Sequence, residues 1–214
     1  MNNNELSTIT LFPTQISIVN RLDFVRPCLE VFEEYISTAR SESVADSIYP
    51  VTQTYDMLQD GRISSFLEFI SETAWDILND QGYNMDMFYT QANSVWGQSH
   101  PKTSSMEYHS HSSLISGFFF LSVPENSSQL QFHDPRPVKT FASLPEKQLN
   151  IITPATNIIN YTPEVGSIYF TNSWLPHSVT RNASDEPVKF IHFNIHTIPR
   201  HGSGFENQNE PVIV

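Results

Sequence analysis

The chain has 214 residues, and 11 Lys and Arg stand against 23 Asp and Glu, which gives a formal net charge of −12. This acidic balance disfavours a nucleic-acid backbone as the main ligand, because phosphates need Lys and Arg. The single cysteine, Cys28, excludes an internal disulfide and a thiolate metal cage. The length favours one domain, and neither a signal peptide nor a transmembrane span is apparent in the sequence. We therefore expect a soluble, cytoplasmic protein.

The first third of the chain predicts an extended segment followed by helices. Residues 8–19 alternate as an extended segment near a sheet edge. Apolar residues within 28–39 recur at helical spacing, and a second helix is predicted over about 65–79, with Gly82 as its stop. We expect this helical part, about 20–82, to brace a sheet.

From residue 87 onward the pattern changes to short strands separated by turn residues, which predicts a β-sandwich or barrel over about 87–198. The tail, residues 200–214, is rich in Gly, Asn and Glu and is expected to fray. The predicted strands are 88–96, 106–109, 114–123, 129–132, 151–152, 157–161, 167–171, 179–181 and 188–195.

The stretch from His109 to Arg136 concentrates metal-binding residue types. It opens with His109-Ser-His111, continues through an apolar strand, a polar turn and a second strand, and ends in His133-Asp134-Pro-Arg136. If the two strands form a hairpin, their outer ends meet at one edge of the sheet. Three imidazoles, one carboxylate and one guanidinium would then gather there, which indicates a metal site with an anion-binding group.

A further histidine, His177, follows a predicted strand and stands behind Trp174-Leu-Pro. A histidine held by a neighbouring Trp and Pro has a rigid position. On its own it would be interpreted as structural, but together with the His-x-His pair it becomes the third candidate ligand.

Residues 163–177 resemble the C-terminal signature of the 2-oxoglutarate/Fe(II) oxygenases, and the chain as a whole is similar to a branch common in marine bacteria and their phages. The resemblance implies a mainly β double-stranded β-helix, or jelly roll, with N-terminal helices buttressing one sheet. It also implies Fe(II) and the co-substrate 2-oxoglutarate in the mouth of the roll. The matching pieces are Leu11–Thr14, Trp96, His109–His111, Ser116–Phe119, Asp134–Arg136, Trp174–His177 and Phe193–Asn194.

The family pattern of iron ligands is His-x-Asp/Glu and a distant His, whereas this chain has His111 in place of the carboxylate. Three ligand sets stay open. The first is His109, His111 and His177. The second takes Asp134 as the carboxylate. The third has one histidine of the pair with His177, and water or another anion in the remaining positions.

The family also implies a cation for the far carboxylate of 2-oxoglutarate, normally on the strand after the distal histidine. Lys189 is the favoured candidate, with Arg181 and Arg136 as alternatives. Alternation along the strand supplies a test: if Asn194 faces the site, Lys189 does not. Tyr108 is a candidate hydrogen-bond donor to the same molecule.

The remaining aromatic and histidine residues receive structural predictions. Trp96 and Trp174 are expected in the core or in the walls of the mouth, and His100, His196 and His201 at the surface or in the tail.

The sequence thus predicts an Fe(II)/2-oxoglutarate-dependent dioxygenase, a hydroxylase of an unidentified substrate that converts 2-oxoglutarate and O₂ to succinate and CO₂. The alternatives are a cupin-like three-His metalloenzyme that does not use 2-oxoglutarate, and a non-catalytic jelly-roll module. We expect small-molecule partners and neither membrane nor nucleic acid, and a homodimer stays open. A phage-encoded chain would work in the host cytoplasm.

Overall fold

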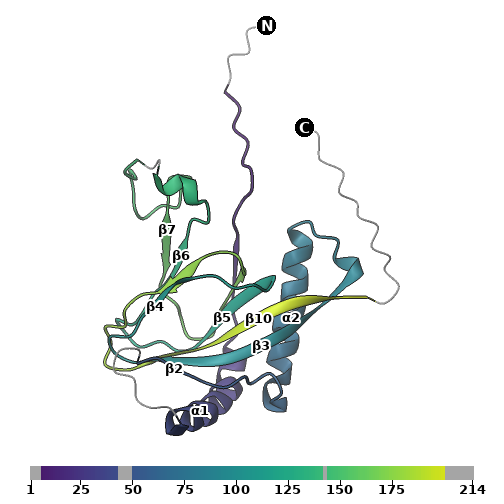
Figure 1. Ribbon diagram of the computed structural model, residues 1–214, viewed down its shortest axis with the longest axis vertical. Helices are drawn as coiled ribbons and strands as arrows, with labels where there is room; N and C mark the ends of the chain where they lie inside the picture. Colours follow the sequence, from purple (N-terminus) through teal and green to yellow (C-terminus); the bar gives the residue numbers. More distant parts are fainter. Residues whose placement is uncertain (1–5, 43–49, 142–143, 201–214) are drawn as a thin grey trace.

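The computed structural model describes residues 6–42, 50–141 and 144–200 (Figure 1). Two antiparallel sheets and two long helices make up this part of the chain. The predicted tail lies outside the described residues from residue 201 onward. Within the described ranges, no helix is both long and apolar enough to span a bilayer.

Both predicted helices are confirmed, α1 as Val25–Glu42 and α2 as Ser64–Asp80. Gly82 follows α2 with a φ of 92°, a left-handed conformation that favours glycine, so the predicted stop is also confirmed. The described ranges also contain four short 3₁₀ helices: η1 (Leu22–Phe24), η2 (Gly61–Ile63), η3 (Met85–Met87) and η4 (Pro137–Phe141).

The strands form two sheets, and the predicted jelly-roll class is confirmed. The larger sheet has the order β1-β8-β5-β10-β3-β2, and the smaller one β4-β9-β6-β7. In the larger sheet the strands are β1 (Ile16–Asn20), β2 (Thr52–Gln53), β3 (Phe88–His100), β5 (Ile115–Ser122), β8 (Ser167–Asn172) and β10 (Val188–Pro199). In the smaller sheet they are β4 (Met106–His109), β6 (Leu130–His133), β7 (Ile158–Tyr161) and β9 (His177–Val179).

Each face of the larger sheet has its own apolar core. Alternate residues of β5 point to opposite faces. Phe119 packs with α1 and α2, and its ring centroid lies 5.0 Å from that of Phe66. Phe118 belongs to the second core, between the two sheets, together with Phe190. The helices therefore cover the outer face of the larger sheet, and the smaller sheet covers its inner face.

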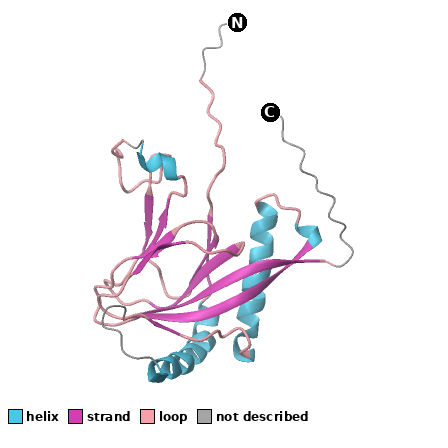
Figure 2. Ribbon diagram, in the orientation of Figure 1, coloured by secondary structure: helices cyan, strands magenta, loops and turns pink. Residues whose placement is uncertain are grey.

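The strands before and after the turn at residues 123–129 do not form the predicted hairpin. β5 lies in the larger sheet between β10 and β8, whereas β6 lies in the smaller sheet between β9 and β7. Both strands bury apolar residues, and each completes a different sheet of the sandwich. The end of β6 nevertheless reaches β9, because the His133 N–H donates to the Pro176 carbonyl (2.9 Å). The pair β6–β7 carries η4 at its far end (Figure 2).

Two further predictions about strands are wrong. Residues 151–152 form a bend instead of a strand. The strand predicted to end at Trp96 continues to His100, because β10 pairs with β3 over its whole length, Val188 being the partner of His100.

Candidate metal centre

Three histidines from separate segments meet at one end of the smaller sheet. His109 is the last residue of β4, and its register partner is His177, the first residue of β9. His111 lies in the loop beyond β4, where its N–H donates to the Ser173 carbonyl (2.8 Å). One ligand atom from each ring lies within 4.8 Å of the others, a spacing that can hold a metal ion. The His-x-His pair therefore converges, although only its first member is in the strand.

The hydrogen bonds of two of these rings leave the metal-facing nitrogen available. His177 Nδ1 lies 3.1 Å from the Leu175 carbonyl and His109 Nδ1 lies 2.7 Å from the Glu107 carbonyl. A carbonyl only accepts, so each Nδ1 carries the proton and each Nε2 keeps its lone pair. Among the described residues, the buried Nε2 atoms of His177 and His111 have no hydrogen-bond partner. These residues therefore fit a metal ion.

Burial keeps two of the ligand candidates neutral. It lowers the pKa of His177 to about 3 and that of His111 to about 4, with the charge of His109 as a further cause in both. Neutral imidazole is the form that binds metals. At neutral pH these two rings need not release a proton to accept a metal.

A chain of side-chain hydrogen bonds supports the loop that carries His111. The Ser116 hydroxyl bonds to Asn194 Oδ1 (2.7 Å) and to the Ser173 hydroxyl (2.7 Å). Since the Ser173 carbonyl accepts from the His111 N–H, these residues fix the backbone beneath that ring. Asn194, predicted to bind the co-substrate, therefore lies on the inner face, in this network.

His192 also belongs to this region, although no sequence motif predicts a role for it. Its ring stacks on Trp96 (centroids 4.4 Å apart) and lies 4.5 Å from the ring of His111. Both ring nitrogens are buried and have no hydrogen-bond partner among the described residues. Burial holds the pKa of His192 well below its ordinary value. The alternation of side chains along β10 could have predicted this position, because it places His192 on the same face of the sheet as Asn194.

Asp134, the alternative carboxylate ligand, is held by cations in a loop after β6. Its carboxylate accepts from Arg136 Nη2 (2.7 Å) and from Lys139 Nζ (2.8 Å), and its side chain is 6% exposed. The hydrogen bond from Arg136, followed by that from Lys139, keeps the pKa of this carboxyl well below its usual range. Asp134 is not a member of the three-histidine group. Arg136 is likewise engaged in this ion pair.

The other candidates for 2-oxoglutarate binding are spread over the molecule. Lys189 Nζ lies 2.6 Å from a carboxylate oxygen of Glu33 on α1, on the outer side of the larger sheet. Arg181 is exposed. Tyr108 is also exposed, and its ring contacts that of His133 (5.0 Å). Of these three side chains, Lys189 is thus directed away from the three histidines.

The prediction that His100 lies at the surface is wrong. Its side chain is fully buried at the end of β3, and its ring packs against Phe190 in the core between the sheets (5.1 Å). The strand pattern in the sequence ends at Trp96, before the polar run that follows. Trp174 is half exposed beside the site, as a wall residue would be.

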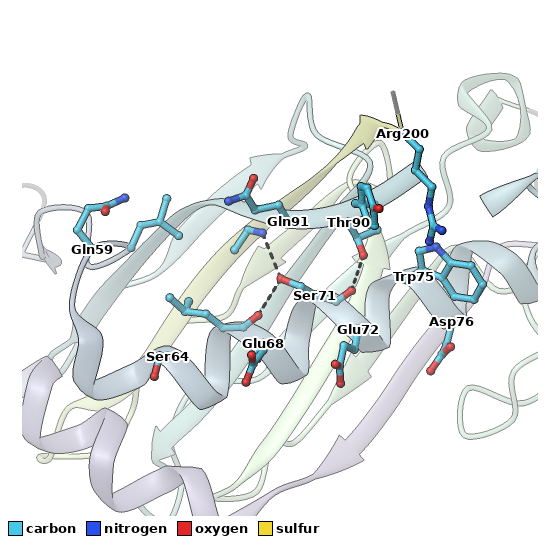
Figure 3. A pocket seen from close by; sticks show the side chains of 14 residues that line it. Gln59, Ser64, Glu68, Ser71, Glu72, Trp75, Asp76, Thr90, Gln91 and Arg200 are labelled. Carbon is cyan, nitrogen blue, oxygen red and sulfur yellow. Dashed lines mark hydrogen bonds between the residues drawn. The ribbon is translucent and has the colours of Figure 1, made fainter. Parts of the chain in front are cut away.

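Two cavities lie at different places in the fold. A cavity of about 250 Å³ is lined by Phe132, the register partner of His177, and by Leu175, and it extends to Asp134 and Arg136. A larger groove of about 810 Å³ runs between α2 and the first half of β3, beside Trp75 (Figure 3). None of the three histidines lines either of these cavities, but the smaller one is lined by two residues that adjoin His177, namely Phe132 and Leu175.

Comparison with known proteins gives one family and a consistent fold. Residues 94–194, which include all three histidines, match the family described as "Putative 2OG-Fe(II) oxygenase". No curated protein matches the chain at a significant level. Among solved structures, a prolyl-4-hydroxylase from Pseudomonas putida is similar at 12% identity and a TM-score of 0.58, with 86% of this chain and 92% of that chain covered.

Two further similar structures have comparable scores. The non-heme alpha-ketoglutarate-dependent carbocyclase SnoK from nogalamycin biosynthesis has 12% identity and a TM-score of 0.61, covering 89% of this chain and 83% of the other. HygX from Streptomyces hygroscopicus, solved with nickel and 2-oxoglutarate bound, has 11% identity and a TM-score of 0.56, covering 86% and 83%. At such identities these likenesses establish the fold. The family match over residues 94–194 identifies this region as that of a 2-oxoglutarate/Fe(II) oxygenase, a family of oxidoreductases.

Proposed function

We propose that the chain is an Fe(II)/2-oxoglutarate-dependent hydroxylase whose iron is held by His109, His111 and His177. The observation that supports this most directly is the convergence of three imidazole nitrogens within 4.8 Å. Bound iron would supply the O₂ chemistry that couples decarboxylation of 2-oxoglutarate, to succinate and CO₂, to oxidation of a second substrate. The protein contributes the ligands, their orientation and a buried setting.

The charge of the site favours an anionic co-substrate. Three neutral imidazoles leave the charge of a metal dication uncompensated, and an uncompensated buried charge is costly. Asp134 is already neutralised by Arg136 and Lys139. A bound 2-oxoglutarate would bring the missing negative charge, which supports the all-histidine ligand set over the set that contains Asp134.

The primary substrate is proposed to approach through the cavity of about 250 Å³ that Phe132 and Leu175 line. Both residues adjoin His177. Phe132 is the register partner of His177, and the Leu175 carbonyl accepts a hydrogen bond from His177 Nδ1. Hydroxylation is the proposed outcome because a prolyl-4-hydroxylase is among the similar folds.

A cupin-like three-His metalloenzyme is the second candidate. Two observations favour it. His111 stands where the family pattern has Asp or Glu, and Lys189, the favoured cation for 2-oxoglutarate, forms an ion pair with Glu33 instead. This candidate predicts an enzyme that holds iron but has no affinity for 2-oxoglutarate.

Anaerobic titration with Fe(II) and then 2-oxoglutarate separates these candidates. Chelation of iron by 2-oxoglutarate should produce a weak charge-transfer band in the visible region. Bound iron without the band would support the cupin-like candidate, and a chain that retains no iron would support a non-catalytic module.

Substitutions in the same assay test the ligand set. We expect His177→Ala and His111→Ala to lose iron, and the near-isosteric Asp134→Asn to keep it as the matched control. His111→Asp should also retain iron, because it restores the carboxylate of the family pattern. Iron loss in Asp134→Asn with retention in His111→Ala would show that Asp134 is the ligand.

A further inference from the structure

The groove of about 810 Å³ between α2 and the first half of β3 has an acidic side. Three exposed carboxylates, Glu68, Glu72 and Asp76, line it in a row along α2 (Figure 3). They are spaced four residues apart, so they lie on one side of the helix. Within the described ranges, none of the three belongs to an ion pair. These charges are therefore available to cations of a ligand.

The floor of the groove, between the carboxylates and β3, is partly apolar. The half-buried side chains of Leu58, Leu67 and Trp75 line it. The indole of Trp75 is fixed, because its Nε1–H donates to the carbonyls of Met85 and Phe88 (both 3.1 Å). A ligand that fits this groove would place apolar surface on the floor as well as cations at the acidic side, which a bare metal cation cannot do.

The strand side of the groove includes an edge of the larger sheet. β2 pairs with β3 only near the C-terminal end of β3, and no strand of the described chain covers this edge from Phe88 to Ala92. The Ala92 N–H points to this edge, where it donates to Ser71 Oγ (3.3 Å). Main-chain groups of alternate strand residues face the same edge, so those of Thr90 also face the groove. An extended polypeptide could hydrogen-bond to them, as in recognition by strand addition.

The spacing of the carboxylates also matches an extended polypeptide. Four residues of an α-helix rise by about 6 Å. Alternate residues of an extended chain, whose side chains share one face, are about 6.6 Å apart. Long cationic side chains on that face would lay their aliphatic stems over Leu67 and Trp75 and bring their charged ends to the carboxylates.

We propose that this groove docks an extended segment of a partner protein that carries Lys or Arg at alternate positions. Its backbone lies along β3 at Thr90, and its cations meet Glu68, Glu72 and Asp76. The groove is a binding site separate from the candidate metal centre, and the inference does not depend on the proposed function.

The charge of the chain favours a basic occupant. The formal net charge is −12, which attracts a cationic segment from a distance. Among the described residues that line the groove, Arg200 is the one cation, and its guanidinium lies over the ring of Tyr89 (4.3 Å). The sequence after Arg200 contains two Glu and neither Lys nor Arg, so charge disfavours this chain's own C-terminal residues as the occupant.

The test is calorimetry of the full chain, at low salt, with a capped peptide in which Lys alternates with Thr. We expect binding that weakens as salt is added. A peptide of the same composition with its Lys residues consecutive should bind about fivefold more weakly, because only part of its cations can reach carboxylates. Binding of the alternating peptide should also change the tryptophan fluorescence of the wild type, and Trp75→Phe should bind without that change.

Two double variants with the same change in net charge separate docking in the groove from general attraction. Glu68→Gln with Glu72→Gln should lower the affinity for the alternating peptide about three- to twentyfold, as expected for two exposed ion pairs. Glu125→Gln with Glu164→Gln, which neutralises two exposed carboxylates outside the groove, should leave it within about twofold.

Four results would overturn the inference. They are absence of peptide binding at about 1 mM, equal losses of affinity in the two double variants, equal affinity for the two peptides, and a dimer of the chain that the Glu68 and Glu72 substitutions dissociate. The last result would assign the groove to a second copy of the chain. Because neither iron nor 2-oxoglutarate is added, these outcomes are independent of the test of the proposed function.

Discussion

The free protein should lose stability in mild acid because of His100, and a single substitution isolates this effect. Burial places the pKa of His100 at about 4 in the folded chain, against 6.5 for an ordinary histidine. As the pH falls below 6.5, the unfolded chain therefore binds a proton that the folded chain excludes. Stability is fully present above pH 6.5 and is lost between pH 6.5 and 4, below which both states are protonated.

The size of the effect follows from the same two values. Each unit of difference between the folded and unfolded pKa values corresponds to about 1.4 kcal/mol. His100 alone therefore accounts for a loss of about 3 kcal/mol in the free energy of unfolding. At pH 5, part-way through this window, the loss is about 2 kcal/mol. His192, His111 and His177, whose pKa values are also lowered by burial, add losses of the same sign.

Urea unfolding of the metal-free protein at pH 7.5 and pH 5 measures the loss. His100→Gln removes the titrating group, so its stability should fall less between the two pH values than that of the wild type, by about 2 kcal/mol. His196→Gln, on the partly exposed end of β10, is the matched control. If His100→Gln and the wild type lose equal stability, His100 is not a buried neutral imidazole and the reasoning is wrong.

Two further predictions concern packing and surface charge. A Cβ on Gly117 would overlap the Phe193 ring and lie 2.5 Å from the Tyr169 carbonyl oxygen, so Gly117→Ala should lower the unfolding free energy by about 1–3 kcal/mol or more. Gly61→Ala, with open space around it, is the control, and equal thermal melting of both would contradict this packing. Lys189→Ala breaks a partly exposed ion pair with Glu33 and should change stability by less than about 1 kcal/mol in urea unfolding; a larger loss would mean that this pair is desolvated.

The parts of the fold that could be predicted from sequence are those with a local periodic pattern. Apolar spacing identified α1 and α2, and alternation identified most strands. Sheet membership was not predictable in this way, because a buried apolar strand such as β5 can pair with many others. The turn at residues 123–129 was interpreted as a hairpin, whereas it connects strands of two facing sheets.

At the candidate site, residues that belong to a recognisable sequence motif were predictable, whereas the residues that surround them in space were not. His109, His111 and His177 follow from spacing and from the family resemblance, and the structure brings them together. The burial of His100 depends on its pairing with Val188, and the place of His192 depends on its stacking on Trp96. Such contacts form between residues that are distant in sequence, so a local sequence pattern does not predict them.

A neutral interior explains how this site can exist before its ligands arrive. A permanent Arg or Lys between the two sheets would be a buried charge without a partner in the free protein, which is strongly unfavourable. Buried histidines avoid this cost, because burial keeps them neutral until an ion provides a reason to charge. The metal dication would then enter among three neutral rings, and the dicarboxylate would bring the opposite charge. Each charge would thus be buried together with its counterpart, and the apolar packing of Phe118 and Phe190 around the histidines would not have to accommodate an isolated ion.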